Sequence, residues 1–348
     1  MARILYAASG DGYGHAVRAH SVGAGLLARG HDVRFVSSHK TIQYLSHFFP
    51  DRLHEVFGLL TTYDEGSVQF WTTFVSNLQR ASRGLGTSLR ALDRLLVEFD
   101  PDLVMTDFEP FTALRARRRG IPFISLDNQH LLTHCVVDHP AGYRGDRMNA
   151  YLAIRIYFGG AKRYLVTSFF PAPPRYHPAT VVAPILRSSV YDRVTRDDGF
   201  ILAYMGASGS FARACRVLEQ EAGLPVRAYG FGREGASGHV EFKRTDPHEF
   251  LNDLASCRAV IATAGHSLVS ECLHLEKPML LAPIQRQYEQ VLNAHHVQKL
   301  GLGRACNGLD AAVLREFLAN VDSYRQALSR RPKAELAPVL DAIEKEIP

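Results

Sequence analysis

Short runs of apolar residues alternate along the chain with longer amphipathic stretches and with clusters of glycine and polar residues. In the first half, the apolar runs fall at 4–8, 32–37, 102–107, 121–126 and 164–167. The first run leads into a glycine-rich turn, then into a stretch at 15–29 with apolar residues at helical spacing, and then to Gly30. This order predicts strand–helix–strand units, in which consecutive strands are parallel.

The same alternation restarts in the second half. Strands are predicted at 200–204, 226–229, 240–242, 259–263 and 279–282, with helices between them. Between the halves, residues 170–178 include four prolines, which stiffen the chain and disfavour helix. We therefore predict an α/β protein with a Rossmann-like domain at 1–170, a linker at 171–198 and a second Rossmann-like domain at 199–330.

The composition narrows the class of protein without identifying it. The 348 residues are 46% hydrophobic and 22% charged, which is typical of a soluble globular protein and excludes a disordered tail or a collagen-like repeat. The formal charge of +5 favours anionic ligands or lipid surfaces, but is too small to indicate nucleic acid. Five separated cysteines without a C-x-x-C pair indicate reduced thiols rather than disulfides or zinc.

The location predicted from the sequence is the cytoplasm. The first residues enter a predicted strand directly, so no secretory signal is recognisable, and no run of about 18 apolar residues could span a bilayer. The basic run at 115–119 is typical of a solvated helix end, but it could also contact anionic lipid head groups. Peripheral contact with the inner face of the membrane is therefore left open.

Polar and glycine residues gather in the loops that directly follow predicted strands. These loops lie at 9–15, 107–110, 205–210, 263–267 and 283–290. Open parallel sheets bind ligands at the carboxyl ends of their strands. Two sheets with those ends facing each other would form one cleft between the domains, and we expect the functional residues there.

The loop after the first strand presents a histidine at a helix start. It departs from the dinucleotide motif G-x-G-x-x-G, because His15 replaces the third glycine, which argues against a nicotinamide site. A neutral imidazole there could accept a proton from an incoming hydroxyl, or it could simply pack against the turn. Asp107, at the end of a buried strand, could orient that imidazole or cap a turn. Asp11 and Glu109 are rival carboxylates.

Two small-residue turns in the second half could bind an anion. The turn at 206–210 resembles a nucleophile elbow, but its fifth residue is serine, so it fits an anion-binding turn or a plain tight turn better. Gly265 and Ser267 could donate to a diphosphate at a helix start. Glu271, one turn later on the same helical face, could accept two ribose hydroxyls or could be an ordinary solvated residue. The polar cluster at 285–290 suits sugar hydroxyls or an amphipathic helix start.

No residue pattern indicates a metal ion. The only D-x-D, at 100–102, precedes its strand and so faces away from the ligand edge. His130, His134 and His139 lack an ordered ligand spacing, and we expect them in an acceptor loop or on the surface. Neither a metal nor a cofactor is therefore predicted.

Several of these segments resemble glycosyltransferases with the GT-B architecture of two Rossmann-like domains. Residues 10–18 read Gly-acid-Gly-x-Gly-His-x-x-Arg, the opening loop of a bacterial and archaeal group, and Arg-Gly-His-Asp-Val follows at 29–33. Residues 263–271 and 283–294 resemble the donor site of the MurG-like and UDP-glycosyltransferase families. The plant signature is absent, because Thr263 and Leu268 stand where plant-type enzymes have histidine and serine.

The resemblance implies a role for each matching residue. It implies that His15 is the catalytic base and Asp107 its orienting acid, and that a C-terminal helix at 331–348 crosses back onto the first domain. The implied donor-binding residues are Gly206, Ser208, Gly209, Ser210, Phe242, Gly265, His266, Ser267, Glu271, Glu289 and Gln290. The candidates on the acceptor side are Asp11, Gly12, Gly14, Glu109 and His130, together with the loops at 61–74 and 128–139.

The function implied is an inverting glycosyltransferase of the hexosyltransferase type. It would move a sugar from a nucleotide-diphosphate donor, most simply a UDP-sugar, to a hydroxyl of a small-molecule, lipid or glycan acceptor, without a metal. The opening loop differs from the Gly-Gly-Thr-Gly-Gly-His of MurG, so a peptidoglycan lipid is not implied as the acceptor. Two alternatives stay open: a nucleotide-sugar 2-epimerase of the same fold, and a non-catalytic nucleotide-sugar-binding protein.

Overall fold

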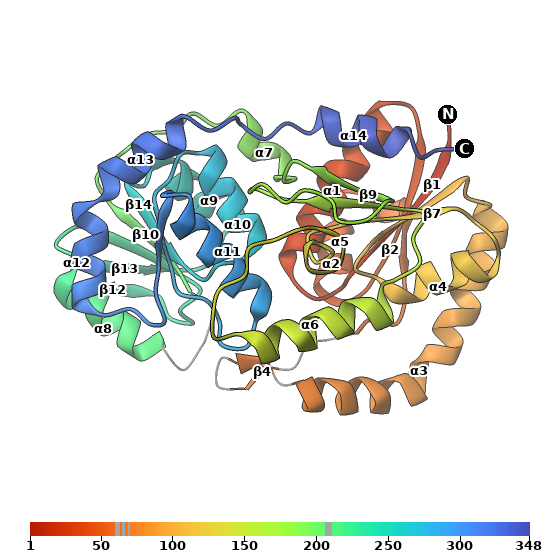
Figure 1. Cartoon of the computed structure of the whole chain (residues 1–348), viewed down its shortest axis with the longest axis horizontal. Helices are drawn as coiled ribbons and strands as arrows, with labels where there is room; N and C mark the ends of the chain where they lie inside the picture. Colours follow the sequence, from red (N-terminus) through yellow and green to blue (C-terminus); the bar gives the residue numbers. More distant parts are fainter. Residues whose placement is uncertain (60–62, 65–66, 69, 206–210) are drawn as a thin grey trace.

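Each half of the chain is built around a largely parallel β-sheet with helices packed against it (Figure 1). The computed structural model describes residues 1–59, 63–64, 67–68, 70–205 and 211–348, and the side chains at 63–83, 211–213 and 215 lie outside that description. Within the described ranges the two large sheets have seven strands each. The predicted α/β class with two Rossmann-like sheets is confirmed.

The first sheet has the strand order of a doubly wound fold. Its strands are all parallel, and in spatial order they are β3 (Leu53–Glu55), β2 (Asp32–Ser37), β1 (Arg3–Ala8), β6 (Leu103–Asp107), β7 (Phe123–Asp127), β8 (Arg163–Thr167) and β9 (Ala179–Val182). The central strands are almost wholly buried, as expected where helices cover both faces of a parallel sheet. That burial explains why they read as continuous apolar runs.

Helices of the first half pack against this sheet and extend below it in Figure 1. They are α1 (Tyr13–Ala28), α2 (His39–Leu45), α3 (Phe70–Phe99), α4 (Pro110–Arg118), α5 (Leu131–His134) and α6 (Arg144–Tyr157). A short 3-10 turn (Pro50–Arg52) and a small hairpin of β4 (Tyr63–Asp64) and β5 (Ser67–Val68) complete this half. One apolar cluster fills the side of α1 and another fills the side of α3 and α4.

The second sheet, like the first, has parallel strands at its centre, but one of its edge strands is antiparallel. Its spatial order is β12 (Gly235–Ser237), β13 (Val240–Lys243), β11 (Val226–Tyr229), β10 (Ile201–Tyr204), β14 (Ala259–Ala262), β15 (Met279–Leu281) and β16 (Gly303–Ala305). The strand β12 is antiparallel to β13, and the other pairs are parallel. The helices of this half are α8 (Phe211–Glu221), α9 (Pro247–Ser256), α10 (His266–His274), α11 (Tyr288–Lys299), α12 (Ala311–Ala319) and α13 (Val321–Ser329).

The segment expected to be a linker, 171–198, contributes a strand to the first sheet. Within it, β9 pairs with β8, and the short helix α7 (Ser188–Tyr191) follows before β10 begins. This strand was not predicted, because the prolines before it indicate an irregular segment. The first domain therefore extends to about Val182, and the chain crosses to the second domain after it.

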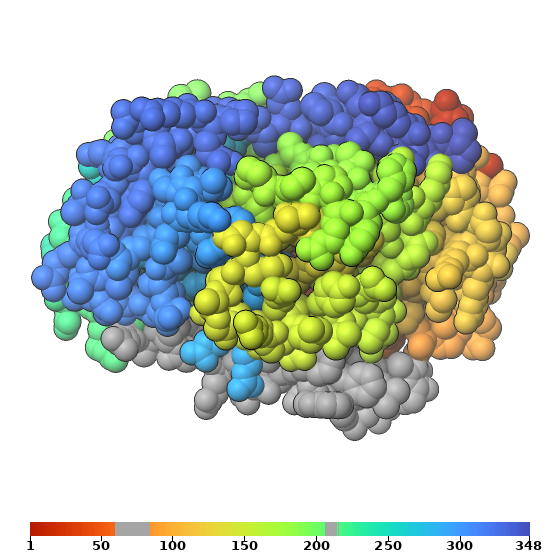
Figure 2. Space-filling model, in the orientation of Figure 1, coloured from red at the N-terminus to blue at the C-terminus, as the bar shows by residue number. Residues whose placement is uncertain are grey.

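The C-terminal segment runs back from the second domain to the first. Figure 1 shows it passing from α13 to α14 (Ala337–Glu344), which lies beside α1 near the N-terminus, and Figure 2 shows this segment lying over both halves. The carboxylates of Asp341 and Glu344 both accept from Arg29 of α1. Apolar residues of α14 join the core of the first domain.

Besides this C-terminal segment, direct contacts between side chains hold the two domains together. On the first-domain side, Asp138 forms ion pairs with His295 and Lys299 of α11. Next to them, the ring of Phe170 stacks on His296 at 3.6 Å between centroids. One apolar cluster includes residues from both sheets, so the two halves share part of their core. Among the helices of the described part of the chain, none combines the length and apolar character needed to cross a bilayer.

We predict that two helix-interior glycines respond in opposite ways to substitution. A Cβ at Gly23 would lie 2.3 Å from the Phe35 ring, whereas one at Gly86 in α3 would meet nothing within 4 Å. Gly23→Ala should lower the free energy of unfolding by about 1–3 kcal/mol through overpacking. Gly86→Ala should raise it by up to about 1 kcal/mol, because alanine favours helix. Urea denaturation measures both, and equal stability of the two variants would contradict the close packing of α1 on β2.

Candidate active site

The loop after β1 is shaped by its glycines. Gly10 lies against Ser38, where a Cβ would come within 2.1 Å of the hydroxyl oxygen, and Gly12 has a φ of 102°, which disfavours any side chain. The helix α1 then begins at Tyr13, and within the described residues no side chain caps its first turn. The positive end of the helix dipole therefore lies at this loop.

The structure brings His15 and Asp107 together as the sequence predicted. Ala8 pairs with Asp107 across β1 and β6, so the loop after β1 lies beside the end of β6. The Nδ1 atom of His15 is 2.8 Å from Oδ1 of Asp107. The carboxylate of Asp107 is fully buried, and the His15 side chain is 12% exposed.

A third residue, Arg18, completes this group. One turn after His15 on α1, its Nε and Nη2 atoms donate to the two oxygens of Asp107 at 2.6 and 2.8 Å. Burial alone would raise the pKa of the Asp107 carboxyl, but the charge of Arg18 and the hydrogen bonds from His15 and Arg18 hold it below its ordinary value. An ionised carboxylate only accepts hydrogen bonds, so Nδ1 of His15 carries a hydrogen in this contact.

The residue after Asp107 is held in an uncommon conformation. Phe108 has a φ of 56°, a left-handed backbone that costs energy for a bulky residue. Its ring lies nearly parallel to that of His15, at 6.3 Å between centroids, and stacks on Phe158 at 3.6 Å. Phe108 therefore lies between the imidazole and Phe158, and it packs closely on Phe158.

The second domain faces this group with the start of α10. Gly265 precedes the helix, and among the described residues no side chain caps its first turn. A Cβ on Gly14 would lie 2.7 Å from the Ser267 hydroxyl, so the loop of the first domain and the helix start of the second lie against each other. The predicted meeting of the two loops across the domain boundary is therefore present in the structure.

His266, the first residue of α10, is buried beside the first domain. Its Nε2 atom is 3.5 Å from the hydroxyl of Thr167, at the end of β8, while its Nδ1 atom has no hydrogen-bond partner among the described residues. Burial and the charge of Arg18 lower the pKa of His266 to about 3. The ring is therefore neutral at physiological pH.

Glu271 is buried rather than solvated, and it is ion-paired. It lies on α10 with 1% of its surface exposed. The Nε and Nη2 atoms of Arg187 donate to its two oxygens at 2.5 and 2.8 Å. Burial raises the pKa of the Glu271 carboxyl, and the Arg187 guanidinium opposes this rise.

The polar cluster after β15 braces the neighbouring loops. Gln290 accepts at its side-chain oxygen from the backbone N–H groups of Ala264 and Ile284, and Asn293 donates to the Ala264 carbonyl. The Glu289 carboxylate accepts from Gln129 of the first domain at 3.3 Å, which adds a polar contact between the domains. These contacts hold the segment before α10 against the start of α11.

Two further predicted site residues have structural contacts: Glu109 caps a helix, and Phe242 packs in a core. The Glu109 carboxylate caps α4 by accepting from the backbone N–H groups of Phe111 and Thr112, and burial raises its pKa. Phe242, on β13, is 4% exposed and packs in the core of the second domain. Its backbone pairs with Ala228 and Gly235 of neighbouring strands.

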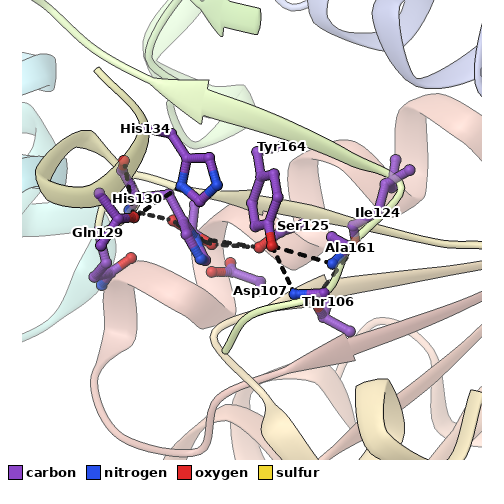
Figure 3. A network of polar contacts seen from close by, with 12 residues as sticks. Thr106, Asp107, Ile124, Ser125, Gln129, His130, His134, Ala161 and Tyr164 are labelled. Carbon is purple, nitrogen blue, oxygen red and sulfur yellow. Dashed lines mark hydrogen bonds and ion pairs between the residues drawn. The ribbon is translucent and has the colours of Figure 1, made fainter. Parts of the chain in front are cut away.

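His130 forms a second histidine–aspartate pair, which the sequence did not indicate. Its Nδ1 atom is 2.7 Å from Asp127 at the end of β7, and Ser125 donates to the same carboxylate at 2.6 Å. Figure 3 shows His130 and His134 beside Tyr164, and the rings of His134 and Tyr164 are stacked. The Nε2 atom of His130 is buried without a hydrogen-bond partner in the described part of the chain.

Some predicted site residues cannot be placed. Gly206, Ser208, Gly209 and Ser210 lie outside the described residues, as do all the side chains of the predicted acceptor loop at 61–74. Asp11 lies in the loop after β1, and its backbone N–H donates to the Ser9 hydroxyl. No group of three or more His, Cys, Asp or Glu side chains is arranged to hold a metal ion in the ranges that the structure covers.

Comparison with known proteins identifies the family. The model of glycosyl transferase family 1 matches residues 2–322, so the chain belongs to that family. It is 24% identical to a UDP-N-acetylglucosamine–N-acetylmuramyl-(pentapeptide) pyrophosphoryl-undecaprenol N-acetylglucosamine transferase of Sinorhizobium medicae, over 93% of this chain and 88% of that protein. This protein is therefore a glycosyltransferase.

Solved structures show the same fold at low sequence identity. UGT2 of Phytolacca americana, complexed with UDP-2fluoro-glucose and pterostilbene, has a TM-score of 0.68 and 14% identity, over 99% of both chains. The glycotransferase of kitacinnamycin has a TM-score of 0.66 and 18% identity, over 100% of this chain and 99% of that chain. The glycosyltransferase VinC in complex with DTDP has a TM-score of 0.63 and 15% identity, over 99% of both chains. The GT-B architecture that the sequence resemblance implied is confirmed.

Sequence reasoning missed the two arginines that neutralise the buried carboxylates. Arg18 stands in the opening motif, three residues after His15, so helical spacing could have placed it beside that histidine. Arg187 gave no such signal, because it lies 84 residues before Glu271 in an irregular segment. A pairing over that separation follows only from the way the two domains dock.

We predict that Arg18→Met destabilises the fold strongly. It leaves the buried Asp107 carboxylate without its cation, which should lower the free energy of unfolding by about 3–5 kcal/mol at neutral pH. The double variant Arg18→Met/Asp107→Asn should lose less than the sum of the single losses, because it removes both charges. Because the pKa of Asp107 is lowered in the folded state, the wild-type ion pair stabilises at neutral pH and weakens as the pH falls below the carboxyl's ordinary value. Additive losses in urea denaturation would contradict the coupling.

Proposed function

We propose that this glycosyltransferase moves a sugar from a UDP-sugar to an acceptor hydroxyl with inversion, using His15 as the base and no metal ion. The observation that carries the proposal is the 2.8 Å contact between His15 and Asp107, beside the start of α10. A base on one wall and a nucleotide-binding helix start on the other are what a single displacement at the anomeric carbon requires.

The charge state of Asp107 fixes which ring nitrogen of His15 carries a hydrogen. With Arg18 and Asp107 paired, the carboxylate holds the Nδ1 hydrogen of His15, and the free Nε2 lone pair can take the acceptor proton. As the acceptor oxygen attacks the sugar carbon, the bond to the diphosphate oxygen breaks on the opposite face. The imidazolium formed in this step would be stabilised by Asp107.

The leaving diphosphate would be stabilised by helix starts. The first turn of α10 carries backbone N–H groups and the Ser267 hydroxyl, and the positive end of its dipole favours negative charge. Residues 206–210, which lie outside the described part of the chain, would supply a second set of donors on the grounds of their small side chains. These groups would replace the divalent cation that supports the same departure in other folds.

UDP is proposed as the donor nucleotide on the strength of two relatives. The transferase of Sinorhizobium medicae is named for UDP-N-acetylglucosamine, and the Phytolacca americana enzyme was solved with a UDP-sugar analogue. Glu271 would hold the ribose, and Glu289 and Gln290 would hold the donor sugar. The name of the first relative includes a pyrophosphoryl-undecaprenol lipid, and the second was solved in complex with pterostilbene. We therefore propose a small-molecule or lipid-linked acceptor at the loops of the first domain, together with peripheral membrane contact.

We predict that His15→Ala slows transfer by roughly 10²–10⁴-fold while leaving the affinity for UDP nearly unchanged, because the imidazole acts on the acceptor. Steady-state kinetics with a UDP-sugar and a hydroxyl acceptor, together with calorimetry with UDP, measure the two effects. His47→Ala, at an exposed histidine of the same domain, is the matched control and should retain full activity. Full activity of His15→Ala would show that another group is the base.

We predict an inverted product and a rate that does not depend on a metal. Proton NMR of the glycoside should show the anomeric configuration opposite to that of the donor, and EDTA should leave the rate unchanged. Incubation of the donor alone should give no epimeric sugar, which separates transfer from 2-epimerisation. Retention of configuration, loss of activity in EDTA or an epimeric sugar would each contradict a part of the mechanism.

A further inference from the structure

The ion pair between Arg187 and Glu271 joins two parts of the chain that belong to different domains. Arg187 immediately precedes α7, and its neighbour Leu186 is tied to the first domain because the Ser21 hydroxyl of α1 donates to the Leu186 carbonyl at 2.7 Å. Glu271 lies on α10 of the second domain. The guanidinium therefore reaches from the segment between the domains into the donor half of the cleft.

The geometry of this pair fixes the carboxylate and leaves half of its hydrogen-bonding capacity open. Each oxygen of Glu271 accepts one hydrogen bond from the arginine fork, at 2.5 and 2.8 Å. A carboxylate has about four acceptor positions, so roughly one remains on each oxygen. Among the residues that the structure describes, no other side chain donates to Glu271. The two open positions are what a pair of neighbouring hydroxyls on one ring can use.

Burial makes the arginine necessary for this arrangement. With 1% of Glu271 exposed, an unpaired carboxylate at this position would be costly, and the group would take up a proton instead. A protonated carboxyl would donate at one oxygen and would lose its affinity for two hydroxyl donors. The guanidinium of Arg187 also lies over the ring of Phe250, with 5.8 Å between its central carbon and the ring centroid. This cation–π contact helps to define the position of the guanidinium.

We propose that Arg187 is a positioning residue that keeps Glu271 ionised and aligned for the vicinal hydroxyls of a ribose, so that the donor site prefers ribonucleoside over 2′-deoxyribonucleoside diphosphates. This inference rests on the proposed function, since it assigns Glu271 to the donor nucleotide. It narrows the donor class, because a 2′-deoxyribose offers one hydroxyl where the site is built for two. A site with an unpaired buried acceptor discriminates strongly against the ligand that lacks the donor.

The test compares UDP with 2′-deoxy-UDP by calorimetry in the full chain. For wild type we expect UDP to bind roughly tenfold or more tightly, because the missing hydrogen bond is to a charged group. In Arg187→Met the affinity for UDP should fall while that for 2′-deoxy-UDP changes less, so the ratio moves toward one. Arg187→Lys, which keeps the charge without the fork, should give an intermediate ratio. Glu271→Gln should lose the preference as well, and the double variant Arg187→Met/Glu271→Gln should lose no more.

A control variant and three different results separate the positioning role of Arg187 from the choice of donor nucleotide. Arg193→Met, a neighbouring arginine that bonds Asn252, should leave both affinities unchanged, and thermal unfolding of each variant shows that it is folded. Equal weakening of both ligands in Arg187→Met would overturn the positioning role and indicate contact with the diphosphate or a purely structural role. Equal binding of both ligands by wild type would overturn the donor class alone. Failure of wild type to bind UDP at all would overturn the proposed UDP donor together with this inference.

Discussion

The buried carboxylate of Asp107 sets the strongest constraint on this structure. A charge without solvent needs a compensating partner, and the chain provides Arg18 and His15 from one helix, one turn apart. For both to reach the end of β6, α1 must start directly after a tight glycine loop beside that strand. The short loop, the close contact of Gly10 with Ser38 and the neighbouring positions of β1 and β6 all serve this requirement.

A similar arrangement recurs where the domains meet. Glu271 is buried on α10 and neutralised by an arginine from the segment that connects the domains. Gly14 lies against Ser267, and Glu289 accepts from Gln129. The C-terminal segment is held to the first domain because Asp341 of α14 accepts from Arg29 of α1. Ion pairs, a hydrogen bond and a close backbone approach therefore hold the two domains against each other at several separate points.

The sequence predicted the parts of the fold that depend on local pattern. The central strands of each sheet read as apolar runs because both faces of a parallel sheet are covered, and the helix at α1 follows from its spacing. It did not predict β3, β9, β12 or β16, because these are short edge or near-edge strands with mixed burial. In the candidate site, His15 and Asp107 could be predicted from the ends of neighbouring strands, whereas Asp127 beside His130 and the capping role of Glu109 could not.

By itself, the sequence determined the two-domain α/β plan and the loops where polar groups collect, since each follows from periodicity, turn chemistry and motif spacing within about 30 residues. The class of the protein followed from the resemblance of those motifs to a known family. Only the tertiary structure decided which charges meet. The pairing of Arg187 with Glu271 and the contact of Gly14 with Ser267 join residues from separate domains. Such pairings depend on the packing of whole sheets and on the cost of burying a charge, and neither leaves a periodic trace in the chain.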